Sequence, residues 1–135
     1  MKTIERVFET LKNQGLVPSM EEYGIAFRYQ MTNFIYMPDK EDDEFFNMLI
    51  PGIYDVSGED ESDILHAINS VNNAMKVVKI VISSDSVWAC FESELSQDAS
   101  VDELVPFAVA TLFQARVRFY DALKMYSEEN VFRMN

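Results

Sequence analysis

The chain has 135 residues, and its 23 acidic side chains outnumber its 11 basic ones, which gives a net charge of −12 at pH 7. Such a charge repels the phosphates of nucleic acids and of anionic lipids, so we expect no nucleic-acid partner and no membrane partner. Apolar residues make up 48% of the sequence, which favours one packed domain over a disordered chain.

No stretch of the sequence approaches the about 20 consecutive apolar residues that a membrane-spanning helix needs. Charged side chains interrupt residues 1–16, whereas a signal peptide has a continuous apolar run. The single cysteine, Cys90, excludes an internal disulfide and a multi-cysteine zinc site, and it fits a reducing compartment. We therefore expect a soluble cytoplasmic protein.

Segments with helical spacing and segments with strict alternation of apolar residues follow one another along the chain. Thr3 is expected to cap the first helix, and Gly15 is expected to end it. Residues 32–33 are expected to form the turn between the first two strands, and residues 51–52 to end the third. The expected elements are a helix over 3–14, strands over 23–31, 34–37 and 45–50, a helix over 60–75, strands over 77–82 and 87–91, and a helix over 100–125.

This order predicts an α+β fold, α-β-β-β-α-β-β-α, with an antiparallel sheet and helices packed mainly on one face. Residues 1–126 are expected to form a single domain, and residues 127–135 a C-terminal tail. Ser100 and Glu103 fit a capping box that opens the last helix.

The acidic residues are concentrated in one part of the sequence. Between Asp39 and Asp63 lie ten acidic residues and one basic residue, so this segment carries −9 of the net charge of −12. Its loop, residues 38–43, is expected to be solvated and dispensable for folding. The segment predicts electrostatic attraction of a basic protein partner.

We find no catalytic or metal-binding signature in the sequence. His66, the only histidine, lies inside a predicted helix, and no nucleophile motif accompanies it. Cys90 has apolar neighbours and is expected to be an inert thiol. Glu92 and Glu94 share one face of a strand end and are expected to be solvated. The acidic segment does not match calcium-loop spacing. We expect no catalytic residue, no metal, no cofactor and no enzymatic activity.

The register of the strands at 77–82 and 87–91 decides which side chains face away from the helices. With an even number of turn residues, Val81, Trp88 and Cys90 lie on the outer face and form an exposed apolar patch, and such patches mark interfaces. With an odd number, Trp88 faces inward as part of the core. Both registers remain open at this stage, and Val81, Trp88 and Cys90 are our candidate partner-binding residues.

The last predicted helix carries two apolar stripes, whereas a surface helix in a monomer needs only one. Two stripes indicate either deep burial or a second subunit, so we expect a homodimer. The first stripe comprises Leu104, Ala108, Leu112, Ala115, Phe119 and Leu123, and the second comprises Val105, Val109, Phe113, Val117 and Tyr120.

Short segments spread over the chain also carry a family likeness. They are residues 27–30 (FRYQ), 33–34 (NF), 43–46 (DEFF), 50–51 (IP), 68–72 (INSVN), 76–79 (KVVK) and 87–92 (VWACFE). With them the sequence resembles the YbjN-like domain family, bacterial proteins with the fold of type III secretion chaperones. The resemblance covers nearly the whole chain, up to Tyr120. It implies a non-enzymatic, regulatory or chaperone-like protein, often dimeric. Chaperones of this fold hold an extended segment of a partner on apolar patches.

We therefore expect a protein-interaction module that binds a protein client or partner. The alternative is a small-molecule-binding or enzymatic α+β domain in which carboxylates line an apolar pocket. A closed, deep pocket with a buried Asp or Glu would favour that alternative.

Overall fold

The computed structural model describes the backbone of residues 1–96 and 100–134 and the side chains of residues 1–96 and 100–128. Its elements, in chain order, are α1 (Thr3–Asn13), β1 (Ser19–Glu21), β2 (Gly24–Tyr29), β3 (Thr32–Tyr36), β4 (Phe45–Asp55), α2 (Glu61–Ala74), β5 (Val78–Ser83), β6 (Ser86–Glu94) and α3 (Val101–Met134). The expected α+β fold is confirmed, with one additional short strand, β1.

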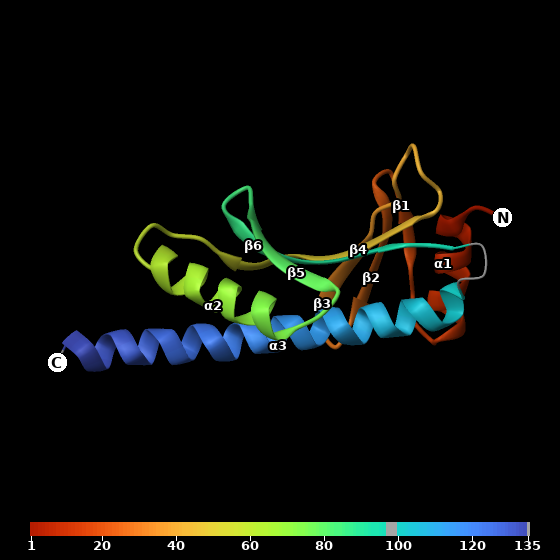
Figure 1. Ribbon diagram of the computed structural model, residues 1–135. Helices are drawn as coiled ribbons and strands as arrows, with labels where there is room; N and C mark the ends of the chain where they lie inside the picture. The colour runs from red at the N-terminus through yellow and green to blue at the C-terminus, as the bar shows by residue number, and fades with distance from the viewer. Residues whose placement is uncertain (97–99, 135) are drawn as a thin grey trace.

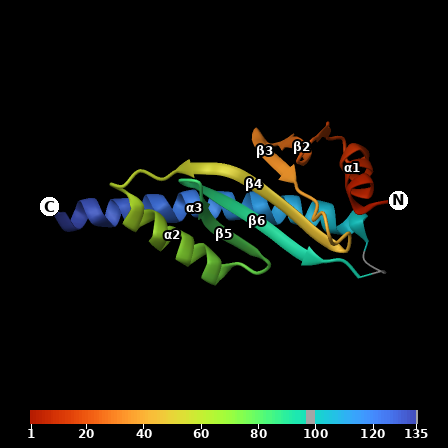
Figure 2. The ribbon, with the colours of Figure 1, turned by 90° about the horizontal axis from the view of Figure 1, so that it is seen from above.

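The strands form one six-stranded antiparallel sheet in the order β1-β2-β3-β4-β6-β5. The long helix α3 runs beneath this sheet, with α2 beside its C-terminal half and α1 near its N-terminal end (Figure 1). Viewed from above, β4 and β6 lie in front of α3, and no described helix covers them (Figure 2). We call the uncovered side of the sheet the outer face.

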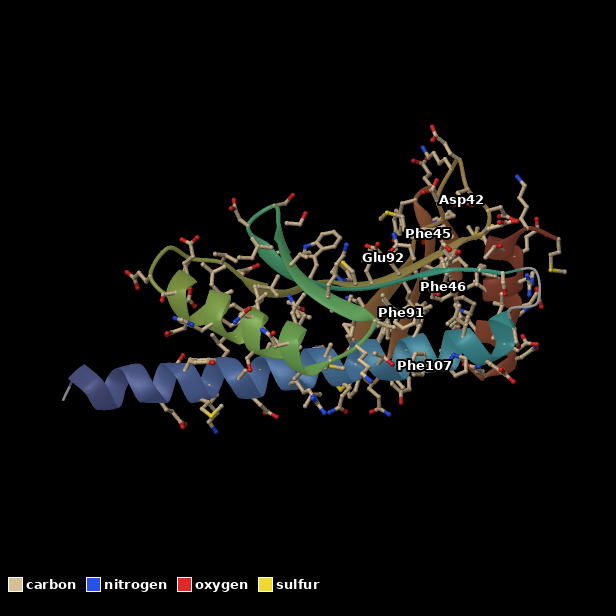
Figure 3. All side chains as sticks on the ribbon, viewed as in Figure 1. Asp42, Phe45, Phe46, Phe91, Glu92 and Phe107 are labelled. Carbon is tan, nitrogen blue, oxygen red and sulfur yellow. The ribbon has the colours of Figure 1, made fainter. Side chains whose placement is uncertain are left out.

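Side chains alternate between the two faces along each strand, and those on the inner face fill the space between the sheet and α3. Phe46 of β4 and Phe91 of β6 point toward α3, whereas Phe45 and Glu92 lie on the outer side (Figure 3). The ring centroids of Phe46 and Phe91 are 5.8 Å apart in an edge-to-face contact, and Phe46 also packs against Tyr36 at 5.2 Å. All three rings are buried and form the middle of the core.

Both apolar stripes of α3 pack against other elements of the same chain. Val105 and Val109 of the second stripe are buried, and the Phe113 ring meets the Tyr29 ring edge-on at 5.7 Å. The Tyr120 hydroxyl donates a hydrogen bond to the carbonyl oxygen of Ile53. The sheet therefore covers most of the second stripe, so this stripe no longer argues for a second subunit.

Two predicted strand boundaries are wrong. The turn between β2 and β3 is formed by Gln30 and Met31, with φ of 51° and 60°, and not by residues 32–33. This two-residue turn matches the twist of the hairpin without the glycine or asparagine that usually signals it. In addition, β4 continues through residues 51–52 to Asp55, because a bulge after Ile50 accommodates the proline.

Three further differences concern the ends and faces of elements. Strand β1 has only three residues, all exposed, so no alternation of apolar residues predicts it. Helical spacing predicts one apolar stripe of Ile64, Leu65, Ile68, Val71 and Met75, but Leu65 is half exposed because the buried face of α2 is centred on Ile64, Ala67 and Val71. Helix α3 runs to Met134, so residues 127–134 continue the helix that was expected to end near residue 125.

The start of α1 is capped from another part of the chain. Thr3 was predicted as the N-cap, but it is the first helical residue, and Lys2 at the cap makes no side-chain hydrogen bond. The Thr3 backbone N–H donates to Asp43 Oδ1 at 3.2 Å, and the Thr3 hydroxyl donates to the Asp43 carbonyl oxygen at 2.6 Å. A carboxylate at this end of a helix is favoured by the helix dipole. One residue of the acidic loop is therefore structural.

We expect Asp43→Ala to lower the free energy of unfolding by about 1–2 kcal/mol, since it removes the cap of α1. Glu41→Ala is the matched control, because it removes one charge from the same loop and its side chain is exposed. Urea denaturation of both variants measures the difference. Equal stability of the two variants would show that the contact between Asp43 and Thr3 contributes nothing.

Tyr36 is fully buried, and among the described residues its hydroxyl has no hydrogen-bond partner. Burial, with a smaller contribution from the charge of Asp43, raises the pKa of Tyr36 to about 12. In the unfolded chain the Tyr36 hydroxyl ionises near its usual pKa of 10.0. The contribution of Tyr36 protonation to the free energy of unfolding is therefore fully present below pH 10 and is lost as the pH rises toward 12.

We expect Tyr36→Phe to raise the free energy of unfolding at neutral pH by about 1 kcal/mol, because it removes an unpartnered buried hydroxyl. The variant should also not show the decrease in the free energy of unfolding between pH 10 and 12, which amounts to about 2–3 kcal/mol for this difference in pKa. Denaturation of both proteins near neutral pH and between pH 10 and 12 tests this. A variant that is less stable than wild type at neutral pH would contradict it.

Candidate functional site

The register of β5 and β6 is the even one of the two that the sequence allowed. Ile82 pairs with Val87, Ile80 with Ala89, and Val78 with Phe91. These residues point toward the helices, and all except Ile82, at the strand end, are buried. Trp88 opposes Val81, so both lie on the outer face with Cys90. The structure thus decides between the two registers in favour of the outer face, whereas the role of these residues in partner binding stays a prediction.

An apolar row crosses the outer face from strand to strand. Ala26 of β2 pairs with Ile35 of β3, Ile35 with Leu49 of β4, and Leu49 with Cys90 of β6. We call Ala26, Ile35, Leu49 and Cys90 the outer row. Leu49 is only 5% exposed, so the row's accessible surface comes mainly from its other members. The row is thus a continuous apolar strip on the open side of the sheet.

Trp88 extends the outer row along β6. It lies two residues before Cys90 and faces the irregular part of β4, between Ile50, which pairs with Ala89, and Tyr54, which pairs with Val87. The indole is half-buried, and its Nε1–H donates to the Ser86 hydroxyl at 2.7 Å. The hydrogen bond holds the ring in one orientation and leaves part of its apolar surface uncovered.

An open groove begins at the other end of the outer row. It has a volume of about 710 Å³ and lies between the segment after α1 and the outer side of β2 and β3. Ala26, Ile35 and Pro51 belong to its lining, so the groove and the outer row form one connected surface. Arg28 and Asn33 supply polar groups, and none of the described acidic residues lines the groove.

The thiol of Cys90 lies beside an ion pair on the outer face. Lys79 Nζ is 2.8 Å from Glu92 Oε1, and both side chains are partly exposed. Burial raises the pKa of the Cys90 thiol, and the charge of Lys79 only partly offsets this. The thiol is therefore protonated at neutral pH, which fits a packing role better than a nucleophilic one.

The acidic segment does not form one surface. Strand β4 separates the acidic residues of its two flanking loops by its own length, roughly 30–35 Å for eleven residues. At one end, Asp42, Glu44 and Glu94 line an acidic hollow of about 470 Å³. Phe45, which pairs with Glu94, joins this hollow to the outer face.

No arrangement typical of an active site is present in the described part of the chain. Its buried polar residues are three threonines, so no described Asp or Glu is buried. His66 is exposed and stacks on Tyr126 at 5.3 Å. No three described His, Cys, Asp or Glu residues are grouped to hold a metal ion. No described helix is long and apolar enough to cross a membrane.

The solved structures to which the chain is similar share this architecture. YbjN of E. coli, described as a candidate transcription regulator, has a TM-score of 0.62 at 11% identity, covering 88% of this chain and 90% of YbjN. The chain has a YbjN-like fold. The type III secretion chaperone SycH of Yersinia pestis, solved in complex with a fragment of YscM2, has a TM-score of 0.54 at 15% identity, over 84% of this chain and 96% of SycH.

An uncharacterised protein from Methanothermobacter thermautotrophicus shares the YbjN-like fold with a TM-score of 0.63 at 15% identity, covering 94% of this chain and 98% of that one. No protein-family model matches the sequence, and no curated protein matches it. These likenesses show the fold.

Sequence reasoning identified only one part of the candidate surface on the YbjN-like fold. It offered Val81, Trp88 and Cys90 as candidates in one of the two registers that it left open, but it did not find Leu49 or the groove beside β2. Strand β4 reads as apolar on both faces from Met48 to Ile50, so alternation gives no sign that Leu49 faces outward. The groove needs the segment after α1 to lie over β2 and β3, which no local pattern encodes.

Proposed function

We propose that this chain is a non-enzymatic protein-interaction module that binds a protein client or partner on the outer face of its sheet. The observation that carries the proposal is the connected apolar surface formed by the groove, the outer row and Trp88, with no described helix above it. A half-buried tryptophan in such a surface is the type of side chain that dominates binding energy in interfaces.

The solved neighbours support a role in protein binding. SycH is a secretion chaperone that was solved in complex with a fragment of another protein, YscM2. A protein with this fold can therefore hold a segment of a partner. The open shape of the groove, and a lining that includes no acidic residue of the described part of the chain, favour this function over an enzymatic pocket.

The chemistry of the outer face indicates what kind of segment would bind. Along β4 and β6 the surface changes from acidic, at Glu94 and the hollow beside it, to apolar at Leu49 and Trp88. A partner segment in extended conformation would therefore place basic residues at the acidic end and apolar residues over the outer row. Charge complementarity would speed the encounter and set the direction of the segment.

We also propose that the chain is homodimeric and acts in the cytoplasm. A second copy can cover the outer row in the absence of a partner, and a stable interface needs about 800 Å² from each subunit. The free thiol of Cys90 fits a reducing compartment.

The test is co-purification of tagged wild type, Trp88→Ala and Met31→Ala from the source cells. Met31 is a matched control because it is 88% exposed and lies at the hairpin tip between β2 and β3, away from the outer row. The proposal predicts a partner that wild type and Met31→Ala retain and that Trp88→Ala loses. Equal retention by all three proteins would rule out the outer face as the binding surface.

A further inference from the structure

Strand β5 forms one edge of the sheet, and its outermost hydrogen-bonding groups face away from β6. An edge strand of six residues can pair with a strand of another molecule unless something covers it. In an antiparallel pair, the backbone groups of alternate residues face the edge. Ile80 is one of these residues, and the alternation makes Val78 and Ile82 the others.

A side chain of α2 occupies the middle of this edge. The Asn72 amide Nδ2 donates to the Ile80 carbonyl oxygen at 3.0 Å, and the Ile80 backbone N–H donates to Asn72 Oδ1 at 2.8 Å. The carboxamide thus makes the two hydrogen bonds that an incoming strand would make at Ile80. We call this pair of hydrogen bonds the Asn72 bridge. It blocks the centre of the β5 edge.

The link between α2 and β5 is strained. Val77 directly precedes β5 and has a φ of 61°, in the left-handed region that branched side chains avoid. Val77 is also 56% exposed, so packing does not compensate for this conformation. A movement of α2 away from β5 would let Val77 relax, which favours opening at this link.

Large apolar side chains remain exposed along the same edge. Val77 precedes the strand, and Ile82, which is 37% exposed, lies near its end. Phe107 of α3 is half exposed and contacts the ring of Phe91, the partner of Val78 in the sheet. Three of the exposed large apolar residues therefore lie beside the edge that the Asn72 bridge blocks. Exposed apolar side chains that are grouped in this way are typical of interfaces.

We propose that β5 is a second interaction surface, which the Asn72 bridge keeps closed and which takes a second copy of this chain by antiparallel pairing of the two β5 strands. Pairing centred on Ile80 places Val78 opposite the second copy's Ile82 on the inner side. It places Lys79 opposite the second copy's Val81 on the outer side, so no like charges oppose each other. The sequence of β5 is therefore complementary to itself. This inference does not rest on binding at the outer face.

Asn72→Ala tests the proposal, with Asn73→Ala as the matched control. Asn73 is the next residue of α2 and is exposed, and within the described residues its side chain bonds to Asn69 of the same helix. At a dilution at which Asn72→Ala does not associate, hydrogen exchange of the Ile80 amide should become about tenfold faster than in wild type, because the bond to Asn72 is the one that protects it. Sedimentation of Asn72→Ala should give a larger mass than wild type at the same concentration. Asn73→Ala should match wild type in both measurements.

The double variant Asn72→Ala/Ile82→Pro separates edge pairing from unfolding. Proline removes an N–H that faces the edge and blocks strand addition without loss of a bond to β6. The proposal predicts that the double variant returns to the wild-type mass. A wild-type mass for Asn72→Ala alone would overturn the proposal, and so would a larger mass that persists in the double variant, because association would then not use the edge.

Discussion

Phe46→Ala is expected to lower the free energy of unfolding by about 3–5 kcal/mol, a large part of the stability of a domain of this size. Phe46 is 0% exposed and lies between the rings of Tyr36 and Phe91 at the centre of the core. Alanine at this position leaves a cavity that the neighbouring strands cannot close without breaking the sheet. Urea denaturation measures the loss.

Phe45→Ala is the matched control, because Phe45 is the preceding residue of the same strand and lies on the outer face. It removes the same number of atoms, but the site stays open to water, so we expect a cost of about 1 kcal/mol or less. Equal costs for the two variants would show that both faces of β4 are covered in the free protein.

Trp88→Ala is expected to weaken partner binding by about 2 kcal/mol or more while it lowers the free energy of unfolding by about 1 kcal/mol. The indole is only half-buried in the single chain, so its removal leaves no closed cavity. Its uncovered surface becomes buried only when a partner or a second copy lies on the outer face. Denaturation and titration with the co-purified partner measure the two effects separately.

The opposite result would identify Trp88 as a core residue. A loss of about 3–5 kcal/mol in stability, with unchanged binding, is what truncation of a fully buried tryptophan gives. The interaction surface would then have to lie elsewhere on the molecule.

The sequence alone identified the hairpin of β5 and β6 but left its register open, because the register depends on whether the number of turn residues is even. Ser84 and Asp85 form a two-residue turn with φ of 52° and 61°, which sets Ser83 opposite Ser86. Polar turn residues mark such a hairpin, and once their number is even, alternation places Trp88 on the outer face. The helices were likewise predictable, because their apolar spacing repeats over several turns.

What the sequence did not reveal depends on contacts between distant segments. The cap of α1 joins Thr3 to Asp43, which is 40 residues away, and neither residue signals the other. The Asn72 bridge joins a helix to a strand edge through a side chain that reads as an ordinary polar position. The turn at Gln30 and Met31 is local, but it contains neither the glycine nor the asparagine that usually marks such a turn, whereas the asparagine at position 33 favoured a turn at residues 32–33.

Acrylamide quenching of Trp88 fluorescence, at decreasing protein concentration and then with the co-purified partner, tests the outer-face surface most directly. Trp88 is the only tryptophan, and acrylamide is uncharged, so the net charge of −12 does not repel it. We predict an accessible indole in the dilute chain, lower accessibility at concentrations at which a homodimer forms, and the lowest accessibility with the partner bound. An indole that is shielded to the same extent at every concentration, and that the partner does not change, would contradict the proposal that the outer face is the binding surface.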